Sequence, residues 1–264
     1  MGAVRIATWN VNSIRSRIER VIPWLERTEV DVLAIQETKT REDQFPFFRF
    51  EEIGYEVAHH GLNQWNGVAI ASRVGLSDVQ AGFAGAPLWG EGETPEARHL
   101  AATCGGLRIN SVYVPNGRNL VDPHMDYKVE WLARLRDAAL TWAAQGPTMI
   151  MGDWNIAPQD EDVWSMEFYA DKSHVSPRER AAFRAVVEAG YADLVRPLHP
   201  GPKVYTYWDY QQLRFQKGRG MRIDFILATP DVAARVTGAL IDREERKGKG
   251  ASDHAPVVVD LADA

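Results

Sequence analysis

Short apolar runs alternate with amphipathic segments along this chain, and this alternation constrains the fold more than any other feature. Residues 4–11 (VRIATWNV) are strand-like, residues 13–28 repeat apolar side chains at helical spacing, and residues 30–37 are strand-like again. A strand, a helix and a second strand in succession indicate an α/β arrangement. The chain therefore begins as an α/β protein.

The stretch that follows predicts antiparallel pairing. Three strand-like segments occur at residues 55–61, 67–73 and 107–115. The dipeptides Asn66-Gly67 and Gly105-Gly106 lie in short turns next to these segments. Such dipeptides favour tight hairpins over long crossovers. We therefore expect sheets that mix parallel and antiparallel strands.

The second half of the chain repeats this organisation. A helix is expected from about residue 124 to 145, where Gly146-Pro147 ends it, and another at 176–190, which begins with a Ser176 cap and Pro177. Further strands are expected at residues 148–155, 222–229 and 256–262. No low-complexity linker separates the halves, so we expect one domain over residues 1–264.

Composition narrows the class of protein. Cys104 is the only cysteine, which excludes an intramolecular disulfide and a paired-thiolate zinc site. No apolar run approaches the length of a membrane span, and no secretory leader pattern is present, so we expect a cytoplasmic protein. The formal net charge of −6 argues against binding nucleic acid through overall charge alone. Local clusters of arginine and lysine leave local binding open.

Polar side chains recur at the ends of the expected strands. They are Asn10, Asn12, Glu37, Asp153, Asn155, Asp224, Asp253 and His254. An isolated Asp-x-Asn, such as Asp153 with Asn155, is usually a turn. Loops at one edge of a sheet are, however, where α/β proteins assemble their sites. Because these polar groups recur at the ends of several strands, we expect them to form one shared site.

The chemistry open to this set of residues is narrow. Oxygen ligands without cysteine suit Mg²⁺ or Mn²⁺. A carboxylate beside a histidine can orient and charge it, and the charged ring can stabilise a phosphoryl transition state. A further aspartate can take the proton from an attacking water. Together these groups predict metal-assisted hydrolysis of phosphate esters.

Eight segments, in order along nearly the whole chain, resemble the exodeoxyribonuclease III family within the endonuclease, exonuclease and phosphatase superfamily. They are ATWNVNSIRSR, LAIQETK, NGVAIASR, YVPNG, GDWNIAP, YTYWDY, RIDFIL and SDHAPV. The resemblance implies a four-layer α/β sandwich, in which two central mixed β-sheets are flanked by helices. It implies a monomeric DNA repair nuclease that depends on Mg²⁺, with Mn²⁺ as a substitute. Its substrate would be double-stranded DNA with abasic sites or with blocked or free 3′ ends, which it would cleave as an abasic-site endonuclease, a 3′-5′ exonuclease and a 3′ phosphatase.

The resemblance also implies roles for individual residues. Glu37 would be the principal metal ligand, assisted by Asn10, with Asp253 close to the metal. Asp153 would handle the proton of the water or the leaving group, and Asn155 would orient it. The remaining catalytic groups would be His254 paired with Asp224, and Tyr113 at the target phosphate.

A further set would bind the substrate. It comprises Asn12, Arg98, Asn116, Tyr207, Trp208, Met221 and Ile223. Asn116 would touch the phosphate and Arg98 would lie near the DNA backbone, while Tyr207 and Met221 would wall the pocket for a sugar without a base. Relatives often have Trp or Phe at the position of Tyr207 and a larger side chain at that of Met221, so the balance between abasic cleavage and exonuclease action stays open.

Two alternatives remain at this point. The same superfamily site serves phosphodiesterases and phosphatases that act on small molecules, and a DNA-binding protein without catalysis would keep the fold. The YTYWDY and SDHAPV segments favour DNA as substrate, and each matched catalytic position keeps its expected residue type. The sequence leaves open the number of metal ions and the division of acid and base roles between Asp153 and His254.

Overall fold

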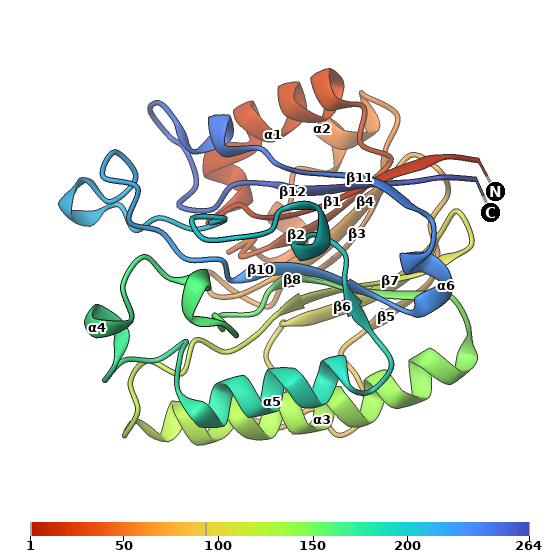
Figure 1. The fold of residues 1–264 in the computed structure, drawn as a ribbon. Coiled ribbons are helices and arrows are strands. Elements are labelled where there is room, and N and C mark those ends of the chain that lie inside the picture. Colours follow the sequence, from red (N-terminus) through yellow and green to blue (C-terminus); the bar gives the residue numbers. More distant parts are fainter. Residues whose placement is uncertain (1, 93, 264) are drawn as a thin grey trace.

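Four layers make up this computed structural model, which describes residues 2–92 and 94–263. Figure 1 shows two sheets stacked face to face, with helices on both outer faces. Helices α1 (Ile14–Thr28) and α2 (Phe47–Glu51) cover one sheet, and helices α3 (Pro123–Gln145) and α5 (Pro177–Val187) cover the other. The predicted four-layer α/β sandwich is confirmed.

The first sheet has six strands in the order β11-β12-β1-β2-β4-β3. Its strands β1 and β2 are parallel and are joined by α1, whereas the neighbouring pairs are antiparallel. The strands are β1 (Val4–Asn10), β2 (Val32–Gln36), β3 (Glu56–His60), β4 (Val68–Ser72), β11 (Val236–Ile241) and β12 (Val257–Leu261). The hairpin expected beside Asn66-Gly67 is the β3–β4 pair.

The second sheet also has six strands, in the order β5-β6-β7-β8-β10-β9. Its parallel pair, β7 and β8, is connected through α3, so each sheet contains one β-α-β unit. The strands are β5 (Ser77–Ala81), β6 (His99–Cys104), β7 (Leu107–Tyr113), β8 (Thr148–Asp153), β9 (Ala192–Asp193) and β10 (Asp224–Ala228). Two short helices, α4 (Met166–Tyr169) and α6 (Pro230–Ala233), lie in the connections.

The largest apolar cluster fills the space between the two sheets. It includes five fully buried residues: Ile6, Val32, Ile109, Met149 and Ile226. Alternate residues of the same strands point outward, so that Trp9 packs against α1 while Ile6 points inward. Burial of each such side chain stabilises the fold by about 1.5–3 kcal/mol. Because these strands are buried on both faces, they read as continuous apolar runs in the sequence.

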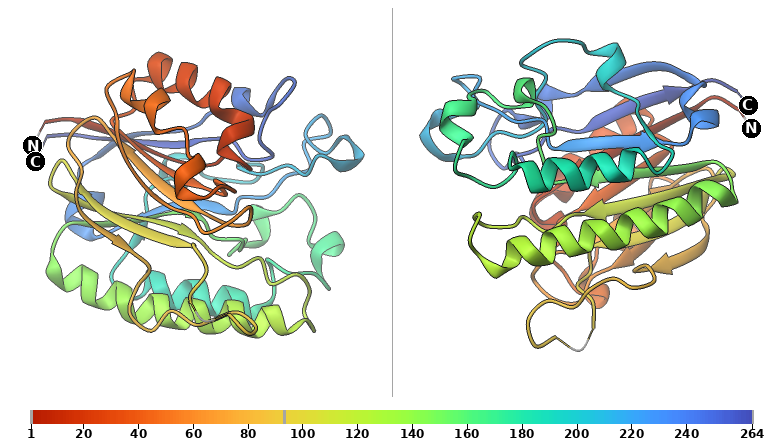
Figure 2. Two further views of the ribbon diagram at one scale, coloured as in Figure 1. Left: turned by 180° about the vertical axis from the view of Figure 1, so that it is seen from behind. Right: turned by 60° about the horizontal axis from the view of Figure 1, so that its bottom comes forward.

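One edge of the sandwich collects the carboxyl ends of the parallel strands, and the two chain termini lie at the opposite end (Figures 1 and 2). Gly152 lets β8 run close to β7 at this edge, because a Cβ there would lie 1.9 Å from the main-chain oxygen of Val112. Asp153 follows directly. Within the described residues, none of the helices combines the length and the apolar character that crossing a membrane requires.

Candidate active site

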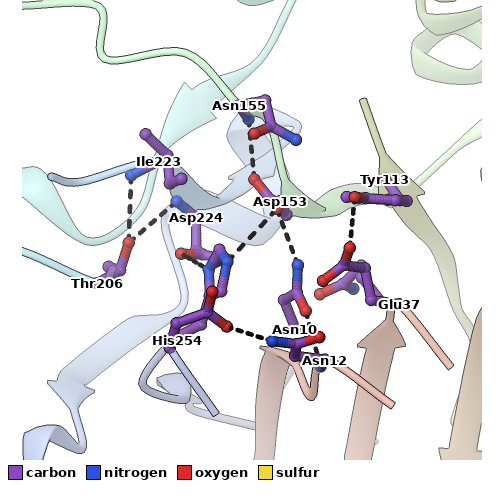
Figure 3. Close-up of polar contacts among 12 residues, drawn as sticks. Asn10, Asn12, Glu37, Tyr113, Asp153, Asn155, Thr206, Ile223, Asp224 and His254 are labelled. Carbon is purple, nitrogen blue, oxygen red and sulfur yellow. Dashed lines mark hydrogen bonds and ion pairs between the residues drawn. The ribbon is translucent and has the colours of Figure 1, made fainter. Parts of the chain in front are cut away.

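The polar residues predicted at strand ends meet at this edge (Figure 3). Tyr113 stands beside Asp153 in the parallel register of β7 and β8, and Asp153 faces Asp224 across the antiparallel pair β8–β10. From the other sheet come the last residue of β1, Asn10, and His254, which precedes β12. The site therefore lies across the gap between the two sheets.

Asp153 is held by contacts from both sheets. Its Oδ2 accepts a hydrogen bond from Asn10 Nδ2 at 2.9 Å and lies 3.7 Å from His254 Nε2. Its Oδ1 accepts the main-chain N–H of Asn155 at 2.9 Å. Burial raises the pKa of this carboxyl to about 7, although the charge of His254 acts in the opposite direction. Asp153 is thus poised to take up or release a proton near neutral pH.

His254 is held as a charged ring. Its Nδ1 donates to both carboxylate oxygens of Asp224, at 2.9 and 3.1 Å, and the imidazole is buried. Burial lowers the pKa of His254, but the charges of Asp224 and Asp153 outweigh it and raise the pKa to about 10. Nε2, which lies 3.7 Å from Asp153 Oδ2, can therefore donate a hydrogen bond to an anionic oxygen at neutral pH.

Glu37 lies on the other side of Asn10. Its backbone is left-handed, with φ of 55°, which turns the chain at the end of β2. Its Oε1 accepts the hydroxyl hydrogen of Tyr113 at 2.6 Å and lies 3.6 Å from the ammonium of Lys39. Burial, together with the negative charge of Glu37, raises the pKa of Tyr113 well above its usual value, so the phenol stays protonated and donates to Glu37.

Oxygen atoms suitable for a hard cation adjoin Glu37. Lys39 Nζ donates to Asn12 Oδ1 at 2.6 Å, and Asn12 Nδ2 donates to Asp253 Oδ1 at 3.1 Å. The ammonium of Lys39 thus lies between the side-chain oxygens of Asn12 and Glu37. Glu37 Oε2 accepts no hydrogen bond from the part of the chain that the structure describes, and its side chain is 16% exposed.

A second set of atoms could also hold a metal ion. Ligand atoms of Asp153, Asp224 and His254 all lie within 4.8 Å of one another. In this set, however, His254 donates to Asp224 and carries a proton on each nitrogen when charged, and a protonated imidazole does not bind a metal. The oxygens around Glu37 fit a hard cation better.

Tyr207 and Met221 border a hollow of about 270 Å³ next to His254. The Tyr207 ring lies 4.9 Å from the ring of His254, and each of the two residues donates its main-chain N–H to the oxygen of the other at 2.9 Å. Ile223 belongs to the same apolar cluster but is 2% exposed and supports the wall from behind. Tyr207 and Met221 thus line the hollow and Ile223 does not, and the use of this hollow as a pocket for a sugar without a base stays a prediction.

Trp208 does not line this hollow. Its side chain is buried with Tyr205 and Phe215 on the other side of the segment, because successive residues of an extended chain point in opposite directions. Its prediction as a pocket wall is therefore corrected.

Arg98, which is predicted to lie near the DNA backbone, is largely buried. Its side chain is 6% exposed, its Nε donates to Glu96 at 2.7 Å, and its guanidinium covers the ring of Tyr113 at 4.9 Å. It also donates to the main-chain oxygen of Tyr113 at 3.2 Å. Arg98 thus holds Tyr113 from behind, but it also lines a hollow of about 530 Å³, and its place near the DNA backbone stays a prediction.

The amide of Asn155 faces away from Asp153. Its Oδ1 accepts from Asn116 Nδ2 at 3.1 Å and lies 3.2 Å from Nε2 of His174, which the sequence analysis missed. Asn155 therefore orients Asp153 through its main-chain N–H. His174 borders the hollow of Tyr207, and burial lowers its pKa to about 4. A lone histidine in a loop gives no sequence signal for this position.

Two hydroxyl groups that the sequence analysis did not single out fix the positions of Asp224 and His254. Thr206 Oγ1 accepts the main-chain N–H groups of Ile223 and Asp224, both at 3.1 Å. Ser252 Oγ donates to the main-chain oxygen of Asn10 at 2.7 Å and accepts the N–H of His254 at 3.2 Å. Both lie inside the YTYWDY and SDHAPV segments, so the segments contained the signal.

Comparison with known proteins identifies the relatives of this chain. Residues 7–254 match the model of the endonuclease/exonuclease/phosphatase family. Exodeoxyribonuclease III of Haemophilus influenzae is 28% identical over 267 residues, covering 96% of this chain and 98% of that protein. The DNA repair nuclease APEX1 of Danio rerio is 27% identical, covering 98% of this chain and 82% of that protein.

Solved structures agree. The 3′ phosphatase NExo from Neisseria, bound to a product DNA hairpin, is 36% identical with a TM-score of 0.94, covering 98% of this chain and 100% of that one. An AP endonuclease from Archaeoglobus fulgidus is 36% identical with a TM-score of 0.92, covering 99% of this chain and 100% of that one. The chain therefore belongs to the endonuclease/exonuclease/phosphatase family, as the resemblance of its motifs to exodeoxyribonuclease III predicts.

Proposed function

We propose that this chain is a DNA repair nuclease that hydrolyses phosphodiesters of duplex DNA at abasic sites and at 3′ ends, and that it acts as a single-domain monomer in the cytoplasm. The observation that carries the proposal is the charged pair of His254 and Asp224 beside the buried Asp153. The relatives named as exodeoxyribonuclease III, AP endonuclease and 3′ phosphatase support DNA as the substrate.

Metal dependence is general in this family. We propose that Mg²⁺, or Mn²⁺ in its place, binds at Glu37, with Asn10 and Asp253 close by. When bound, the ion would polarise a phosphoryl oxygen and neutralise its charge. Two observations support this position. Glu37 has one oxygen without a hydrogen bond among the described residues, and the ammonium of Lys39 already lies against Asn12 and Glu37.

The protein's own residues would do the remaining work. Asp153, whose pKa is raised to about 7 by burial, would accept a proton from water lying against its carboxylate. His254 would donate from Nε2 to a non-bridging phosphoryl oxygen as negative charge grows there. Asn116 and Tyr113 would contact the target phosphate, and the left-handed Asn155 would hold Asp153 toward the water.

Cationic hollows on both sides of the site support a substrate longer than one phosphate. Arg15, Lys39 and Arg41 line a hollow of about 440 Å³ with Trp65, whose surface is 64% exposed. On the other side, a further set lines the hollow of Tyr207: Arg118, Lys172 and Arg214. Basic groups next to an exposed aromatic ring suit a nucleic-acid backbone and its bases.

A labelled duplex with one abasic analogue tests the proposal. We expect the purified protein to cleave beside the lesion with Mg²⁺, to be inactive with a chelator, and to cut the matched intact duplex only from its 3′ end. DNA affinity should fall as salt rises, because phosphate contacts release counterions. Rapid hydrolysis of small phosphodiesters without cleavage of either duplex would instead identify a small-molecule phosphodiesterase.

A further inference from the structure

An ion pair lies fully buried behind the catalytic cluster, between the two helices of the outer layer. Lys128 of α3 donates from Nζ to Glu179 Oε1 of α5 at 2.5 Å, and both side chains are 0% exposed. Burial raises the pKa of Glu179, but the charge of Lys128 and hydrogen bonds from Lys128 and Ser176 lower it overall, so the carboxylate is ionised. Because an apolar pair of the same volume would often stabilise a fold as well, stability alone is a weak explanation for these charges.

The remaining donors of Lys128 reach two different loops of the site. Nζ donates to the main-chain oxygen of Asn155 at 2.7 Å and to that of Asn116 at 3.1 Å. Asn155 follows β8, and Asn116 follows β7. The loop at Asn116 lies directly against the lysine stem, because a Cβ on the left-handed Gly117 would come within 3.0 Å of Lys128 Cδ. One ammonium therefore fixes the spacing of both loops.

Glu179 reaches a third loop. Its Oε1 accepts the main-chain N–H of His174 at 2.8 Å. Its Oε2 accepts the N–H and the hydroxyl of Ser176, at 3.1 and 2.6 Å, which closes the capping box of α5. The same carboxylate thus caps a helix, pairs with Lys128 and anchors the loop that presents His174.

The three anchored residues touch one another at the site. Asn116 Nδ2 donates to Asn155 Oδ1 at 3.1 Å, and His174 Nε2 lies 3.2 Å from the same oxygen. Asn155 and His174 have left-handed backbones, with φ of 50° and 84°, which non-glycine residues keep only when their surroundings hold them. Asn155 in turn donates its N–H to Asp153.

We propose that Lys128 and Glu179 are positioning residues, whose buried ion pair holds the loops of Asn116, Asn155 and His174 at the spacing that aims Asp153. This inference rests on the proposed function for its kinetic consequence. Neither side chain reaches the substrate, since both are fully buried. Their removal should therefore change the rate of the bound complex more than its formation.

The test replaces both charges together. Removing one partner alone leaves a buried unpaired charge and destabilises the fold, so Lys128→Met/Glu179→Leu is the informative variant, with Lys128→Met as the unpaired comparison. We expect the double variant to melt near the wild type and its kcat on the abasic duplex to fall about 10- to 100-fold, as a misplacement of about 1 Å does. KM for DNA should change much less than kcat, because neither Lys128 nor Glu179 contacts a phosphate and only the Asn116 contact depends on the loosened loops.

Arg73→Met is the matched control, because it removes an ion pair with Asp31 next to the amino end of β2, at the opposite end of the sheet. Its kcat should equal that of the wild type. Wild-type kcat in the folded double variant would overturn the proposal, since the pair would then only stabilise the protein.

Amide hydrogen exchange tests the positioning without any substrate. In the double variant, exchange should rise at residues 114–118, 154–157 and 172–176 and stay unchanged in β1 and β12. Unchanged exchange in those three loops would overturn the positioning role even if the wild type proves not to cleave DNA. Failure of the proposed function would appear separately, as a wild type that leaves the abasic duplex intact.

Discussion

Asp224→Asn separates the charge of His254 from its position. The asparagine has the shape of the aspartate, and its side-chain oxygen can still accept the hydrogen bond from His254 Nδ1, which now spans 2.9 Å. The main-chain N–H of residue 224 remains bound to Thr206. What the variant removes is the negative charge that contributes most to keeping the buried ring protonated.

The size and sign of the effect follow from the pKa of His254. This pKa is raised to about 10, so the stabilisation from the Asp224–His254 pair is complete below the ordinary histidine pKa of about 6.5 and is lost as pH rises through about 10. Without Asp224, burial still lowers the pKa while Asp153 still raises it. We expect the pKa of His254 to fall well below about 10 in the variant, and each tenfold change in the protonation equilibrium corresponds to about 1.4 kcal/mol of lost preference for the charged ring.

The assay is a pH–rate profile under single-turnover conditions. Above the lowered pKa of His254, the variant should lose rate about 10-fold for each further pH unit, because only the charged ring donates from Nε2. The wild type should not lose rate in this way until the pH approaches about 10, and protonation of Asp153 should slow it only on the acidic side of pH 7. An NMR titration of the His254 ring gives the pKa directly.

Asp260→Asn serves as the control, because it removes a carboxylate that pairs with Arg5 far along β12 from the site. Its pH profile should overlay that of the wild type. The reasoning is refuted if Asp224→Asn lowers the rate by a constant factor at every pH, since the charge of His254 would then play no part in the reaction.

Two further predictions concern the metal and the pocket. Glu37→Ala should lose most activity in limiting Mg²⁺ and regain part of it at millimolar Mg²⁺ or Mn²⁺, and wild-type cleavage in limiting metal would show that Glu37 is not the ligand. Tyr207→Ala should lower abasic cleavage by roughly 5- to 150-fold, about 1–3 kcal/mol of lost stacking, with less effect at an undamaged 3′ end. Equal losses on both substrates would show that Tyr207 only packs the strand, whereas Asp153→Asn should depress both together.

The sequence predicts those parts of the fold that carry a strong local pattern. Strands buried on both faces, such as β8, read as unbroken apolar runs, and α5 begins at a Ser-Pro pair followed by Glu179. Edge strands lack such a pattern: β5 exposes each of its five residues, and β11 contains Gly238 and a register shift. Their pairing depends on neighbours that are distant in sequence.

The sequence likewise predicts some features of the candidate site and not others. Motifs give the residue types at strand ends, and strand order then brings Asp153, Asp224 and His254 together. What a motif does not give is the partner of each side chain. Arg98 has a charge suited to phosphate but is neutralised by Glu96, and His174 belongs to no motif yet touches Asn155. Such partners are set by tertiary packing.

The charge of the site predicts that a bound cation assists DNA binding as well as the chemical step. Four carboxylates lie close together against two cationic side chains: Glu37, Asp153, Asp224 and Asp253 against Lys39 and His254. Burial raises the pKa of Asp153 to about 7, which relieves only one of these charges. A phosphodiester entering this negative field is repelled unless a bound cation offsets it. Asp153→Asn, which should bind DNA without cleaving it, allows the measurement: its affinity for the abasic duplex should rise at least severalfold when Mg²⁺ replaces a chelator at constant ionic strength. Equal affinities in both solutions would mean that the flanking arginines and lysines hold DNA by themselves, and that the ion acts only in the chemical step.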